Sequence, residues 1–535
     1  MADNQETTTL KIENLRVPAF RTADLKERAA RKLGVHPSAV SGLKILRRST
    51  DARQRRVDFV YTVTARVCAA PRMTVKMLQL PGVSVYVPPD AAGRKAPSRL
   101  AHRPVIVGCG PAGLFAALTL LDRGLRPVVL ERGERIAERS RRVAAFWKHG
   151  LLDVHSNVLF GEGGAGTFSD GKLTTRIKSP HRETVLKTLV AYGAPEEILY
   201  LHKPHVGTDR LRTIIPAFVD DLQRRGAEFH FSTPVVDLEI RHGGIRAVIA
   251  DRRYEARHVF IGTGHSARDV YRMLRIRGVQ FQRKDFAVGL RIEHPQEVID
   301  RAMVRSRAPD PRLLPAQYAL TFHDEATGRG VYSFCMCPGG QVIACADEPD
   351  GLCTNGMSTY RRSGPRANAA IVVTVRAGDF ISGDPFAGVE LQTALEHTAF
   401  TAGGGGFRAP AQRAAAFITA GAARDSGPLE SSFLPGVTGC DLRQLLPVWI
   451  RDPLQRALRA FDRRIPGFIA EGVLIGVETR TSSPLRIVRD AETFHAAGIN
   501  GLIPIGEGSG YAGGIVSSAV DGIKAACAFD RRGPS

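Results

Sequence analysis

The clearest pattern of apolar and polar positions lies between residues 103 and 133. An apolar run at 105–107 predicts a buried strand, and the glycines after it predict a tight turn. The next segment predicts a helix ending at Gly124, because its apolar residues recur at spacings of three and four: Leu114, Ala117, Leu118 and Leu121. A second apolar run at 127–130 predicts another strand, which leads directly into Glu131.

The first hundred residues have a different pattern. A helical stretch begins at Ala23, and segments 41–47 and 57–67 have the composition of strands. Short strands around one or two helices predict a small α+β module. Prolines and small polar residues between 87 and 98 are typical of a linker, so we place the end of this module near residue 98.

Further strands are predicted downstream. Segments 228–232, 235–240 and 246–250 are separated by turn residues, and we expect them to form an antiparallel meander. The meander leads into a buried strand within 258–264 that ends in small residues. Near the C-terminus, segment 501–523 predicts another apolar strand, an acid in a glycine-rich turn, and the start of a helix.

The turn after the first strand has the GxGxxG pattern of a dinucleotide site. Gly108 permits the tight turn, Gly110 lets the backbone approach a pyrophosphate, and Gly113 allows the helix to pack closely on the strand. The N-terminus of the helix offers free amide donors to phosphate. Glu131, 23 positions after Gly108, is placed to bind a ribose diol. A strand, a helix and an acid in this order make an accidental glycine cluster a poor explanation.

The meander and the C-terminal segment favour FAD over NAD. Together with the first turn they resemble the glutathione-reductase class of flavoproteins, in which an acid such as Glu507 binds the ribityl chain. In that class the helix start that follows faces the flavin ring. Most members carry Asp at this position, so here the contact would come from a longer side chain.

The resemblance extends to a bacterial family of FAD-dependent dehydrogenases with a dedicated FAD-dependent-protein C-terminal domain, and it covers about residues 100–530. It rests on long motifs at 145–147, 156–173, 204–209, 264–269, 332–340 and 476–484. The family implies an α/β fold with a glutathione-reductase-type, Rossmann-like FAD-binding domain, an inserted α+β substrate domain and a small α+β N-terminal domain. The corresponding boundaries are 1–98 for the N-terminal module, 99–284 and 466–535 for the split FAD domain, and 285–465 for the insertion. The family supplies no substrate.

We expect FAD to contact residues from four glycine-rich segments. One of them, 161–166, also matches GxGxxG but lacks a helix pattern after it, so we interpret it as a backbone loop beside the flavin. The predicted FAD-binding residues are Gly108, Gly110, Gly113, Glu131, Arg132, Gly163, Gly164, Thr263, Gly264, Gly506, Glu507, Gly514 and Ile515. The neighbours Ser169, Asp170 and Lys172 either contact the cofactor or the substrate or form a solvated turn.

Cys335 and Cys337 form a CxC pair. A dithiol beside a flavin can relay electrons, and residues i and i+2 of a strand share a face. A disulfide across one residue would be strained, however. Zinc binding with Cys345 or Cys353 lacks paired ligand spacing, so no metal is predicted. The remaining alternative, simple packing of the two thiols, is the one that the spacing favours.

His265, Glu478 and Arg480 are the candidates for polar contact with a substrate. His265 follows a predicted strand, and the other two lie in an otherwise small and apolar neighbourhood. The arginine fork suits a carboxylate because it can bind both oxygens. The alternative is a structural Glu–Arg ion pair with a surface histidine.

Composition adds constraints on location. Hydrophobic residues make up 43% of 535 positions and charged residues 24%, which excludes a largely disordered chain. No apolar run approaches the roughly 18 residues needed to cross a bilayer, and the N-terminus lacks a secretory signal pattern. We therefore expect a cytoplasmic protein without membrane contact. The eight cysteines are irregularly spaced, so we expect reduced thiols.

The chain is strongly basic, with 74 Lys and Arg against 53 Asp and Glu and a formal net charge of +21. Such a surface attracts polyanions. The first hundred residues contain 19 basic and 8 acidic residues. No stripe of aromatic residues accompanies these charges, so a generally arginine-rich composition explains them better than a nucleic-acid partner does.

These features predict an FAD-dependent oxidoreductase, a dehydrogenase that transfers a hydride through flavin N5 to or from a small-molecule substrate. Only one complete dinucleotide fold is evident, so electrons would come from a substrate or from transiently bound NAD(P)H. The alternative is a flavoprotein that modifies tRNA or another nucleic acid, with the basic N-terminal module as its docking surface. A non-catalytic FAD-binding protein is a third class.

Overall fold

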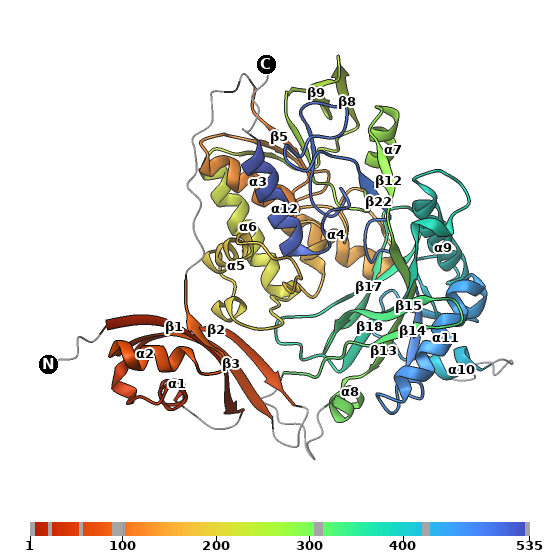
Figure 1. Ribbon diagram of the computed structural model, residues 1–535. Helices are drawn as coiled ribbons and strands as arrows, with labels where there is room; N and C mark the ends of the chain where they lie inside the picture. Colours follow the sequence, from red (N-terminus) through yellow and green to blue (C-terminus); the bar gives the residue numbers. More distant parts are fainter. Residues whose placement is uncertain are drawn as a thin grey trace.

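The computed structural model describes residues 6–19, 24–52, 57–87, 100, 102–303, 314–419 and 428–529. An N-terminal module is followed by a part built on a parallel sheet and a part built on a large mixed sheet. Figure 1 shows the module to one side of the two larger parts. The last part of the chain returns to the parallel sheet, which therefore combines segments from both ends of the sequence.

The N-terminal module is a four-stranded antiparallel sheet in the order β2-β3-β1-β4. With its two helices it has the βαββαβ arrangement of ferredoxin-like modules. Its elements are β1 (Glu6–Pro18), α1 (Leu25–Leu33), β2 (Val40–Asp51), β3 (Asp58–Ala69), α2 (Pro71–Leu78) and β4 (Val83–Val85). Alternate apolar residues of β1 and β3 are buried against α1 and α2, as period-two patterning requires. The predicted helix start at Ala23 and the boundary near residue 98 lie outside the described residues.

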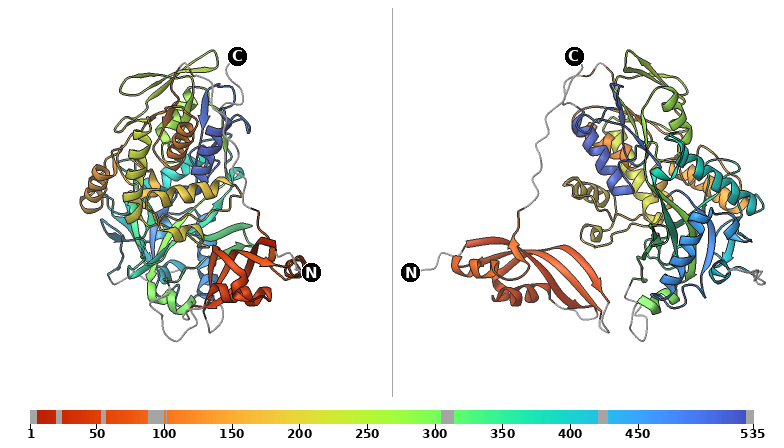
Figure 2. Two further views of the ribbon diagram at one scale, coloured as in Figure 1. Left: turned by 90° about the vertical axis from the view of Figure 1, so that its left-hand side faces the viewer. Right: turned by 45° about the vertical axis from the view of Figure 1, so that its right-hand side comes forward.

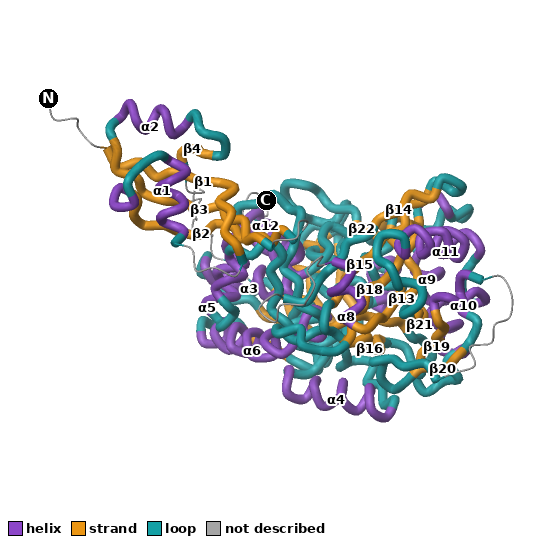
Figure 3. Tube along the Cα trace, turned by 90° about the horizontal axis from the view of Figure 1, so that it is seen from below, coloured by secondary structure: helices purple, strands orange, loops and turns teal. Residues whose placement is uncertain are grey.

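The module touches the rest of the chain along the edge of β2. The amide of Arg48 donates to the carbonyl oxygen of Tyr200 at 2.7 Å, and its carbonyl oxygen accepts from the amide of His202 at 2.9 Å. The Arg48 guanidinium also lies over the Tyr200 ring, 5.6 Å from its centroid. Figures 2 and 3 show the module standing beside the larger body.

The parallel sheet has five short strands in the order β23-β11-β5-β6-β7. Buried apolar side chains on β5, β6, β11 and β23 fit a sheet that is covered on both faces. The strands are β5 (Val105–Val107), β6 (Val128–Leu130), β7 (Glu228–His230), β11 (Val259–Ile261) and β23 (Leu502–Pro504). The helices of this part are α3 (Pro111–Asp122), α4 (Ile136–His149), α5 (His181–Ala191), α6 (Thr208–Arg224), α7 (Arg268–Ile276) and α12 (Ile515–Ala528).

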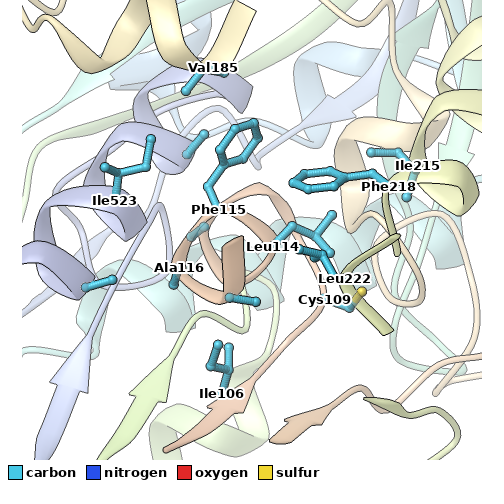
Figure 4. Packing of buried hydrophobic residues seen from close by; sticks show 14 of the residues in the cluster. Ile106, Cys109, Leu114, Phe115, Ala116, Val185, Ile215, Phe218, Leu222 and Ile523 are labelled. Carbon is cyan, nitrogen blue, oxygen red and sulfur yellow. The ribbon is translucent and has the colours of Figure 1, made fainter. Parts of the chain in front are cut away.

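One core joins α3, α5, α6 and α12 to the sheet. Phe115 of α3 and Phe218 of α6 meet edge to face with centroids 5.3 Å apart, and Ile523 of α12 packs in the same cluster (Figure 4). The C-terminal helix is therefore part of the core that supports the first glycine turn.

The predicted meander is partly wrong. Segment 228–230 forms β7, which pairs parallel to β6 at the sheet edge. The antiparallel sheet instead comprises β8 (Asp237–Arg241), β9 (Gly244–Ile249) and β10 (Arg253–Glu255). Sequence patterning finds strands but does not determine which neighbour a short strand pairs with.

The third sheet has seven strands in the order β14-β15-β18-β13-β21-β19-β20. Its strands are β13 (Phe286–Pro295), β14 (Thr321–Asp324), β15 (Arg329–Cys337), β18 (Arg366–Val375), β19 (Ala409–Arg413), β20 (Val437–Gly439) and β21 (Val473–Glu478). The helices of this part are α8 (Gln296–Met303), α9 (Ala387–Ala402), α10 (Ala414–Ile418) and α11 (Val448–Asp462). The sheet extends past the predicted boundary at residue 465, because the fully buried β21 pairs with β13 and β19.

A hairpin of β16 (Gln341–Cys345) and β17 (Cys353–Met357) connects the two larger parts. It contacts β15, β18 and β21, and its apolar side chains share a cluster with Val143 of α4 and Phe168. A two-stranded pair, β12 (Phe281–Arg283) with β22 (Leu485–Ile487), lies at the junction of the same parts. Short 3₁₀ helices cover Pro37–Ala39, Ala165–Phe168, Glu196–Leu199, Ala377–Asp379 and Leu442–Gln444.

Candidate functional site

A cavity of about 550 Å³ lies between the parallel sheet and the seven-stranded sheet. This volume is within the range of ligand sites. The cavity begins at the glycine turn after β5 and continues past the C-terminal glycine turn to side chains of β15, β17 and β21. One cavity thus joins the predicted cofactor segments to the predicted substrate residues.

The turn after β5 leaves backbone exposed to this cavity. Within the described residues, no side chain caps α3, whose N-cap is Gly110. Among the described atoms, a β-carbon at Gly110 would meet only Cα of Gly164, at 3.8 Å, and both glycines line the cavity. A β-carbon at Gly113, by contrast, would lie 2.0 Å from the carbonyl oxygen of Gly108. Gly110 therefore keeps space open for a ligand, whereas Gly113 permits the close contact of helix and turn.

Glu131 connects two glycine loops. Its Oε2 accepts from the amide of Cys109 at 2.8 Å, and its Oε1 accepts from the amides of Gly133 and Gly161, each at 3.0 Å. Glu131 also lines the cavity. Since Oε2 has only one of these partners, it retains capacity for the predicted ribose contact. The next predicted residue, Arg132, lines the cavity as well and binds both carboxylate oxygens of Asp269, at 2.9 and 2.7 Å.

A fully buried arginine, which sequence reasoning missed, shapes the 161–166 loop. Arg139 donates to four backbone carbonyls, those of Asn157, Val158, Glu162 and Gly164, at 2.7–3.0 Å. Burial lowers its pKa to about 10. A signal was present, because Arg139 shares the apolar face of α4 with Val143 and Phe146.

The C-terminal turn brings an acid next to a histidine. Oε1 of Glu507 lies 3.2 Å from Nδ1 of His265, and Oε2 accepts from the Gly514 amide at 3.3 Å. Burial acts to raise the pKa of Glu507, but His265, the Gly514 amide and Lys284 outweigh it and lower that pKa. The other ring nitrogen of His265, Nε2, is buried and has no hydrogen-bond partner in the described part of the chain.

The N-terminus of α12 opens on the same cavity. In the described part of the structure, no side chain caps the helix, and a β-carbon at Gly513 or Gly514 would meet nothing within 4 Å. Free amides and open space at the starts of both α3 and α12 fit the phosphates and the polar ring edge of a flavin dinucleotide. The residues present therefore fit FAD.

Glu478 and Arg480 do not pair with each other. Glu478 binds Nε and Nη2 of Arg291 at 3.0 and 2.8 Å, and it accepts from Oγ1 of Thr354 at 2.9 Å. Arg480 binds the two carboxylate oxygens of Glu396 at 3.0 and 2.8 Å. Both predicted residues line the cavity.

Arg480 has further neighbours in a buried ion cluster. It also contacts Asp347, and Arg268 binds the same Glu396 at 2.9 and 3.0 Å. Nη1 of Arg480 is buried without a hydrogen-bond partner among the described residues. The ion cluster therefore binds Nε and Nη2 of Arg480, and Nη1 remains available to a ligand.

The two cysteines of the CxC pair lie in a bulge. The pairing of β15 with β18 shifts between Phe334 and Cys337, and Cys335 has a φ of +47°. Nζ of Lys172 lies 3.7 Å from Sγ of Cys335 and 3.3 Å from Sγ of Cys337. Regular strand alternation therefore does not describe the pair, and apolar packing does not account for a lysine ammonium against both sulfurs.

The predicted residues divide into those that line the cavity and those that support it. The lining residues are Gly108, Gly110, Glu131, Arg132, Gly164, Ser169, Asp170, Lys172, Thr263, Gly264, His265, Cys335, Glu478, Arg480, Glu507, Gly514 and Ile515. Gly113, Gly163, Gly506 and Cys337 lie behind this surface, where Gly163 donates to the carbonyl of Cys109 at 2.9 Å and Gly506 donates to Asp521 at 2.8 Å. Tyr332, Thr354 and Asn355 also line the cavity and were not predicted.

The parallel sheet, the glycine turns and the cavity are features of a dinucleotide-binding protein of the flavoprotein class. Residues 285–481 match the family described as FAD-dependent protein, C-terminal domain-like, and residues 8–66 match a domain of unknown function, DUF8436. An uncharacterized protein from Clostridium beijerinckii is 40% identical over 506 residues, which cover 94% of this chain and 95% of that protein. The chain belongs to this family of FAD-dependent proteins, as the sequence motifs predicted.

Similarity to solved structures is weaker. The glycine oxidase from Geobacillus kaustophilus is 12% identical, covers 81% of this chain and 96% of its own, and has a TM-score of 0.35. A glycerol-3-phosphate dehydrogenase from Bacillus halodurans, complexed with FAD, is 12% identical, covers 79% and 62%, and has a TM-score of 0.34.

None of the described helices combines the length and apolarity that spanning a membrane requires. Within the same residues, no group of three or more His, Cys, Asp or Glu side chains is arranged to hold a metal ion.

Proposed function

We propose that the protein is an FAD-dependent dehydrogenase that transfers a hydride to or from a small molecule bound at the β15–β17–β21 end of the cavity. The observation that carries this proposal is the continuity of the cavity from the glycine turn after β5 to polar side chains of the seven-stranded sheet. Bound FAD would supply hydride transfer at its N5. The chain itself would bind the cofactor, orient the substrate and handle the proton.

We assign two uncapped helix starts and two acids to the cofactor end of the cavity. The amides at the N-terminus of α3 would bind the phosphates, while Glu131 would bind the ribose. Glu507 and the start of α12 would contact the ribityl chain and the ring. This division corresponds to a glutathione-reductase-type arrangement, in which the FAD domain is split by the segment that carries the seven-stranded sheet.

We assign the substrate end to two residues of the cavity lining, each of which has a buried nitrogen without a hydrogen-bond partner among the described residues. Nη1 of Arg480 would donate to a carboxylate or another acceptor of the substrate. Nε2 of His265 would hold or accept a proton, because Glu507 contacts the opposite ring nitrogen. An unpartnered polar atom beside a cavity is costly unless a ligand or water satisfies it.

The first test is direct. The purified full-length protein should be yellow and should release FAD, not FMN, on denaturation, as measured by its visible spectrum and by chromatography of the released flavin. Titration with NADH and NADPH under argon then tests whether either nicotinamide reduces the flavin and bleaches its colour. FMN alone, or a colourless protein that FAD does not reconstitute, would refute the proposal. A bound flavin that no donor reduces would favour the non-catalytic class.

A further inference from the structure

Lys172 contacts both sulfurs of the CxC pair from a single position. Its Nζ lies 3.7 Å from Sγ of Cys335, 3.3 Å from Sγ of Cys337 and 3.1 Å from Oδ2 of Asp170. An ammonium has three N–H donors, and these three neighbours use them all. Lys172 is therefore committed to the thiols and to one carboxylate.

The positive and negative charges around Lys172 are unequal in number. Asp170 also pairs with Arg362 at 2.6 Å, and Arg291 pairs with Glu478 at 2.8 Å. The cations of this cluster are Lys172, Arg291 and Arg362, and its carboxylates are Asp170 and Glu478. One positive charge is left over in this mostly buried cluster, which is unfavourable unless an anion accompanies it. A thiolate at the adjacent cysteine pair supplies that anion.

Two other titratable groups face the cluster without changing this balance. Burial raises the pKa of the Tyr318 phenol, so it stays protonated and neutral at pH 7. Burial, with help from Arg362, lowers the pKa of His205, so its imidazole is neutral as well. The surplus positive charge therefore persists around neutral pH.

The negative charge is assigned to the first cysteine of the pair. Sγ of Cys337 donates to the carbonyl oxygen of Cys335 at 3.2 Å, which requires Cys337 to keep its proton. A hydrogen bond from Cys337, together with Lys172 and Arg291, holds the pKa of the Cys335 thiol well below its usual range. The hydrogen bond to the Cys335 side chain, and burial, raise the pKa of Cys337.

Position distinguishes the two sulfurs in the same way. Cys335 is half-buried and lines the cavity, whereas Cys337 is 0% exposed and lies behind it. The bulge and the left-handed backbone at Cys335 aim only this residue of the pair at the cavity. A non-glycine residue in that conformation is held there by its surroundings, and such residues are common at functional sites.

We propose that Cys335 is a thiolate that faces the substrate end of the cavity and acts as a nucleophile toward an electrophilic carbon, with Lys172 as its fixed counter-charge. This inference rests on the proposed function, because it places the thiolate where the substrate would bind.

With a neutral alkylating probe the chemistry is one displacement. The sulfur lone pair forms an S–C bond at the methylene of iodoacetamide, the C–I bond breaks, and iodide leaves with its electron pair.

The test is alkylation of the FAD-loaded full chain with iodoacetamide, with each cysteine followed by peptide mass spectrometry. The rate at Cys335 should change less than about threefold between pH 6 and pH 9, because the thiolate already exists. An ordinary thiol with a pKa of about 8.5 would accelerate roughly a hundredfold or more over that range. Cys353 is the internal reference, since it lines the same cavity and its pKa is raised by its hydrogen bond to Cys345 and by burial.

Two lysine variants test whether the alkylation profile of Cys335 depends on the charge of Lys172 or on the loss of any lysine. Lys172→Met should slow alkylation of Cys335 at pH 6 by about tenfold or more and shift its pH profile upward by more than one unit. The matched control, Lys187→Met, removes an exposed lysine that pairs with Glu183 and should leave the profile unchanged. If Lys172→Met does not fold, thiolate absorbance near 240 nm at pH 7 should be greater in the wild type than in Cys335→Ser at equal flavin content.

The outcome is independent of the proposed function, because the flavin content of every sample is measured from its visible spectrum. A yellow protein whose Cys335 follows an ordinary thiol profile would overturn the thiolate and leave the flavoprotein assignment intact. Absence of both alkylation and thiolate absorbance at Cys335 would overturn it equally. A colourless protein that still shows the flat profile would overturn the flavin proposal alone.

Discussion

Gly110 and Gly113 are three residues apart but have opposite surroundings. A side chain at Gly110 would project into the cavity, and one at Gly113 would collide with the Gly108 carbonyl. Gly110→Val should therefore give a soluble, folded protein whose FAD content falls at least tenfold. Gly113→Ala should lose stability, by about 1–3 kcal/mol or more, because backbone must shift to accommodate the methyl group.

Two comparisons make this prediction specific. Thermal unfolding of Gly110→Val should match that of wild-type protein stripped of FAD, because a lost ligand lowers apparent stability by itself. The control Gly378→Ala adds a methyl group where no described atom lies within 4 Å and should change neither stability nor flavin content. A soluble Gly110→Val protein with normal FAD content would contradict the placement of the phosphates.

At the same scale, sequence patterning identified residues that line the cavity better than it identified their partners. Glu131 could be identified because its strand, turn and helix are adjacent in sequence. Glu478 and Arg480 were grouped for the same reason, yet the partner of Glu478 is Arg291, 187 positions away. A strand directs neighbouring residues to different surroundings, and only the completed sheet shows which distant charge each one meets.

Among the elements, α9 contributes one carboxylate to the ion cluster beside the cavity. Glu396 binds Arg268 at the start of α7 and Arg480 after β21, and it is almost fully buried. Glu396→Gln would leave two buried guanidiniums without this charge. We expect a loss of about 3–5 kcal/mol in the free energy of unfolding, measured by chemical denaturation at pH 7.

The pH dependence of this effect follows from the pKa of Glu396. Burial acts to raise that pKa, but Arg480 and Arg268 outweigh it and hold the pKa well below its ordinary value. The contribution of the carboxylate is complete above its unfolded pKa of about 4.3 and is lost as the pH falls toward the lower folded value. The stability difference between wild type and variant should therefore stay constant from pH 6 to 8 and shrink below pH 4. A control, Glu138→Gln, removes an exposed helix pair with Arg141 and should change stability far less.

The helices and strands also show which features local sequence patterns do not predict. The strand, turn and helix of 105–124 could be predicted because hydrophobic periodicity and glycines agree there. The bulge at Cys335 could not, because it depends on the register between β15 and β18. The pairing of β7 likewise depends on β6, which is about a hundred residues earlier in the chain.

At the scale of the whole molecule, the cavity depends on segments far apart in sequence. The β5 turn, the loop at 161–166, the β15 bulge and the turn after β23 all line it. The family resemblance indicated that the C-terminal segment returns to the FAD-binding part. Residue patterns marked Glu478 of β21 as a candidate for substrate contact, but they did not indicate that the β16–β17 hairpin lines the same wall.

The N-terminal module contributes no residue to the cavity lining within the described parts of the chain. Its described backbone contacts with the larger body are those of Arg48 with Tyr200 and His202. A chain of residues 99–535 should therefore remain soluble, bind FAD with the wild-type stoichiometry and keep the wild-type visible spectrum. A folded truncated chain that has lost all FAD would contradict this independence.

The same two proteins test the nucleic-acid alternative when their retention on immobilised RNA is compared at increasing salt. Salt-sensitive retention that disappears with the module would assign the basic module a docking role.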